Sequence, residues 1–444
     1  MADYSTTMLY NVLTVRNLLP ACFKRLQGQL LRLTTLRCRD EATRTPDPYV
    51  PNVVRYQLRY IPIARKRVQS YENILNYQNF FVLLHTKLTY MKKLLLIAMC
   101  VLMSVTTVAQ HIILVEKGSV QSLLDAIGEA NRLNAETNAP RTFILIPDGF
   151  YDLGDRVLTR ISGHNIAIVG QSMRGTVIQN CPDVRTESIS KTAVFQNRGN
   201  NNYFQDLTLK NALDYYLAVP DGRAVTLQDK GTRTICNRVC MLSYQDTYYS
   251  DNERCQSYMY DTEIHGTIDF ICGAGDVWFE RCRIVTEKRN RDGSGINIIT
   301  ATRTSETLWG YVFNRCTVEN DVSMFNFGRS WHTNPHCVWL YTTLLTPEKL
   351  EATRFDDEGM KVSGNYFKEY GTMDAEGRDI TPSTNVVTFT LRDHTQPFTA
   401  ETIMTREEAK LYTLKNVFTD WHPARELRKL ENRSKRLKKV YKLY

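Results

Sequence analysis

The sequence has little of what marks a metal site, a sheet built from hairpins or a membrane-spanning helix. Its 444 residues contain no Cys-x-x-Cys pair and no cysteine and histidine grouping at zinc spacing, so we expect no metal and no cofactor. The hairpin dipeptides Asn-Gly and Asp-Gly are scarce, which argues against a meander of hairpins. The main apolar run, 94–105, has about 12 residues, short of the roughly 20 that span a bilayer.

Charge is distributed unevenly along the chain. The net charge is +9, but residues 1–90 carry +8 and residues 424–444 carry +7. With two lysines at 92 and 93, this leaves −8 for residues 110–423. The main body is mildly acidic, so we expect no nucleic-acid binding. The basic tail, 424–444, is expected to be a helix packed on the end of the fold or a solvated charge run.

A segment with the pattern of a signal peptide begins at Met91 rather than at the start of the chain. Residues 91–109 have a Met, two lysines, an apolar run and small residues near Ala109, the order of a secretory signal. We expect Met91 to be the true start, residues 1–90 to be a spurious, disordered extension, and the product to be secreted or periplasmic, without stable membrane insertion after cleavage. Export permits disulfides among the eight later cysteines. An alternative is that these cysteines are small buried apolar residues with free thiols.

Short apolar runs recur from Phe143 onward with few helical windows, which predicts an all-β fold. A loose repeat of apolar, polar, polar, mostly apolar, variable and apolar residues begins at Phe204, Cys236, Met259, Phe279 and Phe313. Steps of 20 to 34 residues are typical of a right-handed parallel β-helix, a solenoid, over 110–423. A β-sandwich is the alternative, but its strands recur every 8 to 12 residues. Apolar spacing over 119–135 predicts an amphipathic helix that caps the N-terminal end.

Two acidic segments, 244–247 and 266–270, lie 23 residues apart, about one coil. Equivalent positions on successive coils lie roughly 4.8 Å apart, so Asp246 and Asp269 are expected to face one groove. Arg329 and Trp331, two residues apart, share one face of a later strand. A guanidinium beside Asp269 would keep this carboxylate ionised, whereas Asp246 without such a partner would have a raised pKa and donate protons.

Three ordered motifs raise the specificity of this interpretation. SYQDTYYS, GTIDFICG and FGRSW occur in this order, and IVGQSMRGTVIQN, FQDLTLKN and GINIITATRTS fit with them. Together they resemble the pectin methylesterases, carbohydrate esterase family 8, over about 119–423. The resemblance implies hydrolysis of galacturonate methyl esters in pectin, with Asp269 as nucleophile and Asp246 as general acid and base. It also implies that Gln245 stabilises the oxyanion and that Arg329 orients Asp269.

The same resemblance assigns substrate contacts to Trp331 and Tyr248 and implies no metal; we expect pectin or a related pectic polymer as the partner of a monomer. One position departs from the family pattern. Where a second oxyanion glutamine is expected, 22 residues before Gln245, the chain has Arg223. This arginine can donate to an oxyanion and favour an anionic neighbouring sugar, or it can pair with Asp246 and disable it.

Two other functions remain open from the sequence. An esterase or thioesterase for another acyl substrate would use the same scaffold with Arg223 as the difference. A non-catalytic pectin-binding β-helix would result if Arg223 neutralised the site. A pectate lyase is less favoured, because the acidic cluster that would bind calcium is not identifiable.

Overall fold

A computed structural model describes residues 111–443, apart from 219–220, 305–308, 321–322, 333–334, 361–363 and 392–395. The predicted extension, 1–90, and the predicted signal peptide, 91–109, lie outside the described residues. In the described part, no helix is long and apolar enough to cross a membrane.

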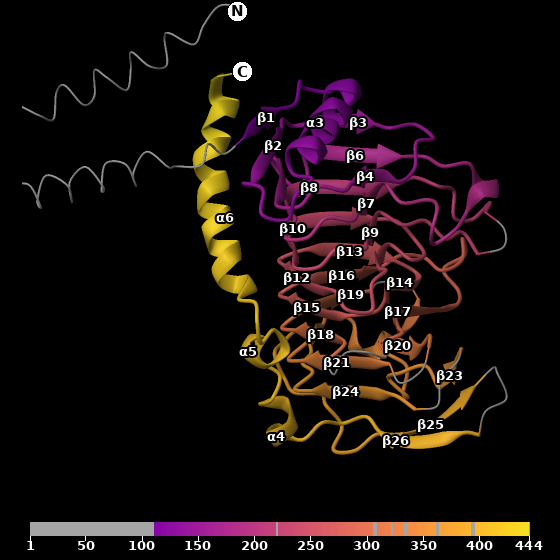
Figure 1. Ribbon diagram of the computed structural model, residues 1–444. Helices are drawn as coiled ribbons and strands as arrows, with labels where there is room; N and C mark the ends of the chain where they lie inside the picture. Colours follow the sequence, from indigo (N-terminus) through magenta and orange to yellow (C-terminus); the bar gives the residue numbers. More distant parts are fainter. Residues whose placement is uncertain are drawn as a thin grey trace, which may run out of the picture. The chain divides into compact units, whose positions relative to one another are not determined.

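The chain winds into a parallel β-helix, as the sequence predicted (Figure 1). Each coil contributes strands to three parallel ladders, so residues one coil apart become neighbours. The first ladder runs through β1 (Ile112–Leu114), β2 (Thr142–Ile146), β5 (Ile166–Gly170), β8 (Tyr203–Asn211), β10 (Thr234–Leu242), β12 (Gln256–Tyr260), β15 (Asp276–Glu280), β18 (Tyr311–Asn314), β21 (His336–Leu340) and β24 (Tyr366–Tyr370).

The other two ladders close the coil. The second contains β3 (Gly149–Asp152), β6 (Thr176–Asn180), the later halves of β8 and β10, β13 (Glu263–Gly266), β16 (Arg283–Thr286), β19 (Thr317–Glu319) and β22 (Thr343–Leu344). The third contains β4 (Thr159–Ile161), β7 (Phe195–Asn197), β9 (Leu227–Asp229), β11 (Tyr248–Ser250), β14 (Ile268–Gly273), β17 (Ile296–Thr302) and β20 (Met324–Ser330).

The sequence repeat marks the corner between the first and second ladders. Its first residue is buried inside the coil in all five copies. Its third residue has a left-handed backbone in all five, which turns the chain at the same place on successive coils. These corner residues are Asp206 (φ 53°), Arg238 (52°), Asp261 (47°), Arg281 (56°) and Arg315 (53°).

Aromatic rings stack along the inside of the coil. Phe279, Phe313 and Trp339 are register partners on consecutive coils of the first ladder. Their ring centroids are 4.3 and 3.9 Å apart, with nearly parallel planes. Such stacks contribute beyond the apolar area that they bury, so each coil is held to the next from within.

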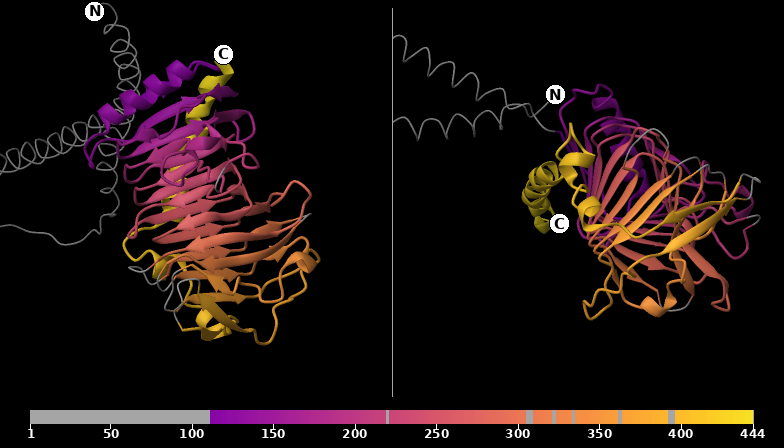
Figure 2. Two further views of the ribbon diagram at one scale, coloured as in Figure 1. Left: turned by 90° about the vertical axis from the view of Figure 1, so that its right-hand side faces the viewer. Right: turned by 90° about the horizontal axis from the view of Figure 1, so that it is seen from below.

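The N-terminal end of the coil carries the expected helix. Helix α3 (Val120–Leu133) starts after Ser119, whose side-chain oxygen accepts from the Ser122 backbone N–H at 3.2 Å. Its buried face includes Leu123 and Ile127, which pack in the interior cluster beside β1 and β2. Figure 2 shows α3 across this end of the stack, where it covers strand edges that would otherwise be exposed.

The opposite end is less regular. It contains the small sheet of β23 (Glu358–Gly359), β25 (Val386–Leu391) and β26 (Phe398–Glu401), in which β25 and β26 are antiparallel. The short helices α4 (Arg406–Ala409) and α5 (Leu414–Val417) follow. A single helical turn, Pro347–Lys349, comes after β22, and another, Val184–Thr186, comes after β6 in the early coils. These elements carry none of the predicted site residues.

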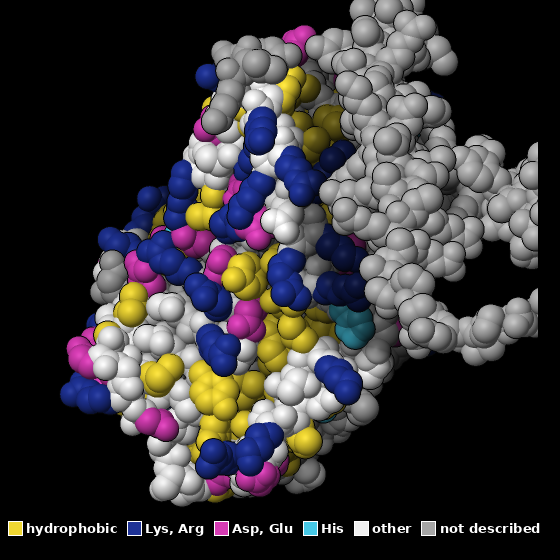
Figure 3. Space-filling view, turned by 90° about the vertical axis from the view of Figure 1, so that its left-hand side faces the viewer, with side chains coloured by type: hydrophobic (Ala, Val, Ile, Leu, Met, Phe, Trp, Pro, Cys, Tyr) yellow, Lys and Arg dark blue, Asp and Glu magenta, His cyan; other side chains and the backbone are white. Residues whose placement is uncertain are grey.

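The basic tail forms helix α6 (Pro423–Leu437) and the turn η3 (Lys438–Leu443). Packing on the end of the coil was predicted, but α6 runs along its side, on the face where lysines and arginines gather (Figures 1 and 3). Leu427 and Leu430 are buried there. The corner residues also bind it, since Arg238 pairs with Glu431 at 2.8 Å and Asp206 pairs with Lys438.

The eight cysteines of the described part all carry free thiols. Seven are buried and Cys181 is exposed. Of the two interpretations that the sequence left open, burial as small apolar residues is the one that the structure has.

Candidate active site

Six of the seven predicted site residues line one hollow of about 320 Å³ on the third ladder. Successive coils supply them, because each lies in or beside a strand of that ladder. They are Arg223 before β9, Gln245 and Asp246 before β11, Asp269 in β14, Arg329 in β20 and Trp331 directly after β20.

The local backbone explains why both aspartates face outward. Tyr248 pairs with Ile271, so Asp246 and Asp269 occupy equivalent places one coil apart. Both have left-handed φ angles, 58° and 51°, and β14 has a register irregularity between Ile268 and Ile271. A bulge of this kind redirects a side chain; Phe270, the next residue, is fully buried in the core while Asp269 lines the hollow.

Asp269 is held by a two-point ion pair. Arg329 Nε donates to its Oδ1 at 2.9 Å and a terminal guanidinium nitrogen donates to Oδ2 at 2.6 Å. Both side chains are only 8% exposed. Burial alone would lower the pKa of Arg329, but the charge and hydrogen bonds of Asp269 outweigh burial and raise it. The pair therefore supplies an oriented anion in a dry setting.

Asp246 has the opposite environment. It is 4% exposed, and in the described part its carboxylate accepts a hydrogen bond from the Cys272 thiol, whose Sγ lies 3.7 Å from Oδ1. Burial, and then the negative charge of Asp269, raise the pKa of Asp246 well above its usual range. One carboxyl is thus paired with a cation while the other is poised to hold a proton, the division that acid and base catalysis requires.

Arg223 pairs with Glu187, a residue that the sequence analysis did not single out. Its guanidinium makes contacts of 2.8 and 2.7 Å with the two carboxylate oxygens, and its backbone N–H donates to Oε2 at 3.0 Å. A second, longer contact of 3.8 Å reaches Asp221. Among the described residues Arg223 makes no ion pair with Asp246, so the disabling bridge that the sequence left open does not form.

Gln245 lies beside Arg223 across a parallel bridge between the two backbones. Its side chain lines the hollow, and within the described ranges its carboxamide makes no hydrogen bond. The amide N–H groups are therefore available to a ligand.

The predicted role of Tyr248 is wrong. Its ring is fully buried inside the coil, edge-on to Phe279 at 6.2 Å, and cannot reach a substrate. Because strand side chains alternate, its neighbour Tyr249 faces the other way. The Tyr249 ring lies 6.0 Å from that of Trp331, and the Arg303 guanidinium lies over both rings at 5.9 and 5.3 Å.

Arg289 is a further residue that the sequence analysis missed. It lines the hollow from the loop between β16 and β17. One terminal guanidinium nitrogen is buried and has no hydrogen-bond partner in the described part of the chain. An unpaired buried donor of this kind is costly unless a ligand satisfies it. In the sequence, Arg289 is marked only as one arginine in a basic loop.

Comparisons with known proteins identify the family and the fold. The pectinesterase family profile matches residues 111–380. Pectinesterase 3 of Solanum lycopersicum is 29% identical over 41% of this chain and 31% of its own length. Putative pectinesterase/pectinesterase inhibitor 38 of Arabidopsis thaliana is 30% identical over 41% of this chain and 36% of its own. The chain thus spans about a third of these curated relatives.

Two solved structures share the fold. The pectin methylesterase from carrot has a TM-score of 0.55 at 18% identity, covering 71% of this chain and 94% of that one. The pectin methylesterase from Erwinia chrysanthemi has a TM-score of 0.52 at 20% identity, covering 72% and 99%.

Proposed function

The chain belongs to the pectinesterase family, and from this premise we propose that it hydrolyses the methyl esters of galacturonate residues in pectin, giving pectate and methanol. One observation carries the proposal. Two buried carboxyls share a hollow, and one of them is held by Arg329 while the other has a raised pKa. A non-catalytic binding protein has no need of this division.

In the first half of the reaction, a carboxylate oxygen of Asp269 attacks the ester carbonyl carbon. The carbonyl oxygen becomes negative and accepts from the free carboxamide of Gln245, a contact worth about 100- to 1000-fold in rate at comparable sites. The C–O bond to the methoxy group then breaks, and the leaving oxygen takes the proton of Asp246. Methanol departs and an acyl-enzyme remains on Asp269.

In the second half, Asp246 is an anion and accepts a proton from water. The hydroxide attacks the acyl carbon, the bond to Asp269 breaks, and the free uronic acid leaves. Arg329 keeps its two hydrogen bonds to the Asp269 carboxylate before and after the cycle, so the nucleophile returns to the same orientation.

The surrounding residues fit a polymer of uronates. Trp331 offers an apolar ring face to a sugar. Arg289 has an unpaired guanidinium nitrogen at the same hollow, and a free carboxylate on a neighbouring galacturonate would satisfy it. Pectin with both free and esterified residues is therefore the proposed partner. Export from the cell stays a prediction, since the predicted signal lies outside the described residues.

The test is methanol release from highly esterified pectin by the purified protein. Asp269→Asn removes the nucleophile at constant volume and should lower the rate by about 1000-fold or more. Asp155→Asn, which changes an exposed aspartate away from the hollow, is the matched control and should keep full activity. Pectin binding without methanol release by the unmutated protein would instead mean a binding protein. Faster turnover of synthetic acyl esters or thioesters would mean another substrate.

A further inference from the structure

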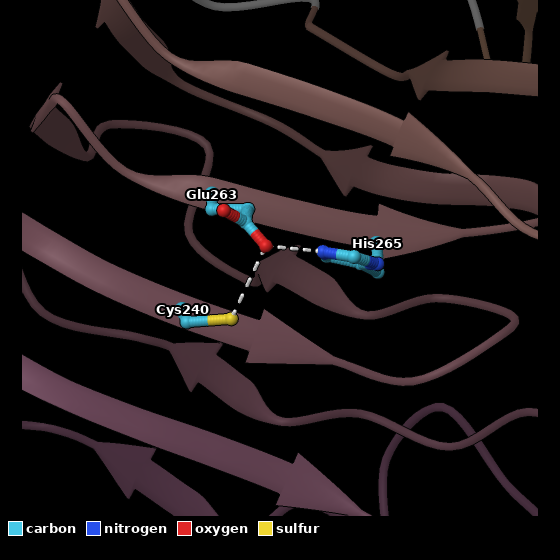
Figure 4. A group of neighbouring side chains, drawn as sticks. All are labelled: Cys240, Glu263 and His265. Atoms are coloured by element: carbon cyan, nitrogen blue, oxygen red, sulfur yellow. Dashed lines mark hydrogen bonds and ion pairs between the residues drawn. The ribbon is translucent and has the colours of Figure 1, made fainter. Parts of the chain in front are cut away.

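A second cluster of reactive side chains lies on the second ladder. Cys240 on β10 and Glu263 on β13 are register partners, and His265 follows two residues after Glu263 on the same face. One ligating atom from each of the three lies within 4.8 Å of the other two (Figure 4). Cys240 and His265 are 25 positions apart and do not form a zinc motif in the sequence, but one coil brings the two side chains together.

Outer contacts fix the orientation of each donor, and Arg174 Nη1 donates to Cys240 Sγ at 3.1 Å. Glu263 Oε2 accepts from Arg174 at 2.6 Å and from Arg283 at 2.9 Å. Its other oxygen, Oε1, is left facing His265 Nε2 at 2.5 Å and Cys240 Sγ at 3.7 Å. His265 Nδ1 lies 2.7 Å from Glu287 Oε1. A carboxylate on the distal ring nitrogen is the usual outer partner of a histidine that binds a metal.

The charges around the cluster suit a divalent cation. Three carboxylates, Glu263, Glu287 and Glu319, face two guanidinium groups, Arg174 and Arg283. With one proton shared by His265 and Glu263 this set is neutral, and it stays neutral when a dication replaces that proton and the thiol proton of Cys240. The metal would replace two protons, that of the thiol and that shared by His265 and Glu263, as metal binding to such ligands requires.

We propose that Cys240, Glu263 and His265 bind a zinc ion. A thiolate, an imidazole and a carboxylate form a donor set typical of zinc. Of the three donors, His265 also lines a second hollow of about 510 Å³, together with its partner Glu287. The expectation from the sequence that no metal binds is replaced by this proposal, which is independent of the esterase reaction.

Zinc at this place would tie two coils together beside the catalytic strand. Cys240 belongs to one coil and the other two ligands to the next. β13 ends at Gly266, three residues before Asp269. The ion would therefore stabilise the segment that leads into the nucleophile, and zinc should raise the thermal midpoint of the folded protein.

The experiment is a cobalt titration of the full chain after treatment with a chelator, in a Cys181→Ser background that removes the exposed thiol among the described residues. One equivalent of Co²⁺ should give a near-ultraviolet thiolate-to-metal absorption band, and Zn²⁺ should displace it. Cys240→Ser should abolish the band. Glu287→Gln should keep the band but weaken affinity by about 10- to 100-fold.

The matched control is Cys236→Ala, which removes a buried thiol from the same strand and should keep the band. The proposal is overturned if the unmutated site gives no thiolate band at one equivalent, or if Cys240→Ser retains it. Should Cys240→Ser fail to fold by circular dichroism, His265→Gln decides: an unchanged affinity in that variant would also refute the site.

Discussion

The ion pair of Arg223 and Glu187 gives the sharpest stability prediction, because Arg223 stands where the family pattern has glutamine. Glu187 has a side chain only 3% exposed and relies on Arg223 for three hydrogen bonds. Arg223→Gln keeps the backbone N–H contact and removes both guanidinium contacts. The carboxylate is then buried with little compensation.

The size of the effect follows from the exposure of the two partners. Breaking a fully buried pair costs about 3–5 kcal/mol, and breaking an exposed pair costs about 0–1 kcal/mol. Arg223 is 34% exposed, so solvent screens part of the interaction and we expect about 2 kcal/mol. Adding Glu187→Gln removes the buried charge, and the double variant should lose less than about 1 kcal/mol.

The assay is a double-mutant cycle of thermal unfolding at neutral pH. Unfolding entropy scales with size, so about 2 kcal/mol corresponds to a fall of roughly 3 °C in the midpoint for a folded region of this size. Arg223→Gln should show this fall, and the double variant should recover most of it. Equal falls in the single and double variants would mean that the two residues do not interact, and the reasoning would be wrong.

Three further outcomes are expected. Cys272→Ala removes a thiol that donates to ionised Asp246, so the pKa of this acid should rise further and the alkaline limb of the pH–rate profile should move to higher pH; an unchanged limb contradicts the contact. Arg289→Met should raise KM for partly de-esterified pectin by about tenfold, with less effect on fully esterified pectin, measured by methanol release. Leu430→Ala should cost about 2–3 kcal/mol in urea unfolding, whereas exposed Arg428→Ala should change stability by less than about 0.5 kcal/mol.

The sequence by itself determined the coil and the two aspartates that face one hollow. The repeat that begins at Phe204 sets one buried residue and one corner per coil, a local pattern that needs no partner to be recognised. Each copy of the repeat corresponds to one coil, so residues at equivalent positions of successive copies become neighbours. Asp246 and Asp269 are such a pair. Arg329 was predicted from the FGRSW motif, further along the chain.

Only the tertiary structure decided which partners these residues have. Alternation along a strand says that Tyr248 and Tyr249 face opposite ways. Which of the two faces the interior depends on the left-handed backbone at Asp246, just before the strand. Nothing in the spacing of single residues joins Arg223 to Glu187, which lies 36 positions earlier on a loop. Cys240 and His265 likewise share no motif and meet because their strands pair.

The tail illustrates the same limit on a larger scale. A helix was one of the two outcomes expected for it, because apolar residues at helical spacing are a local property of the sequence. Its place along the side of the coil depends on Arg238 and Asp206, corner residues about 190 and 230 positions earlier in the chain that bind Glu431 and Lys438. Contacts at that separation form only once the coils are stacked, so local patterns define the elements and long-range packing defines the site.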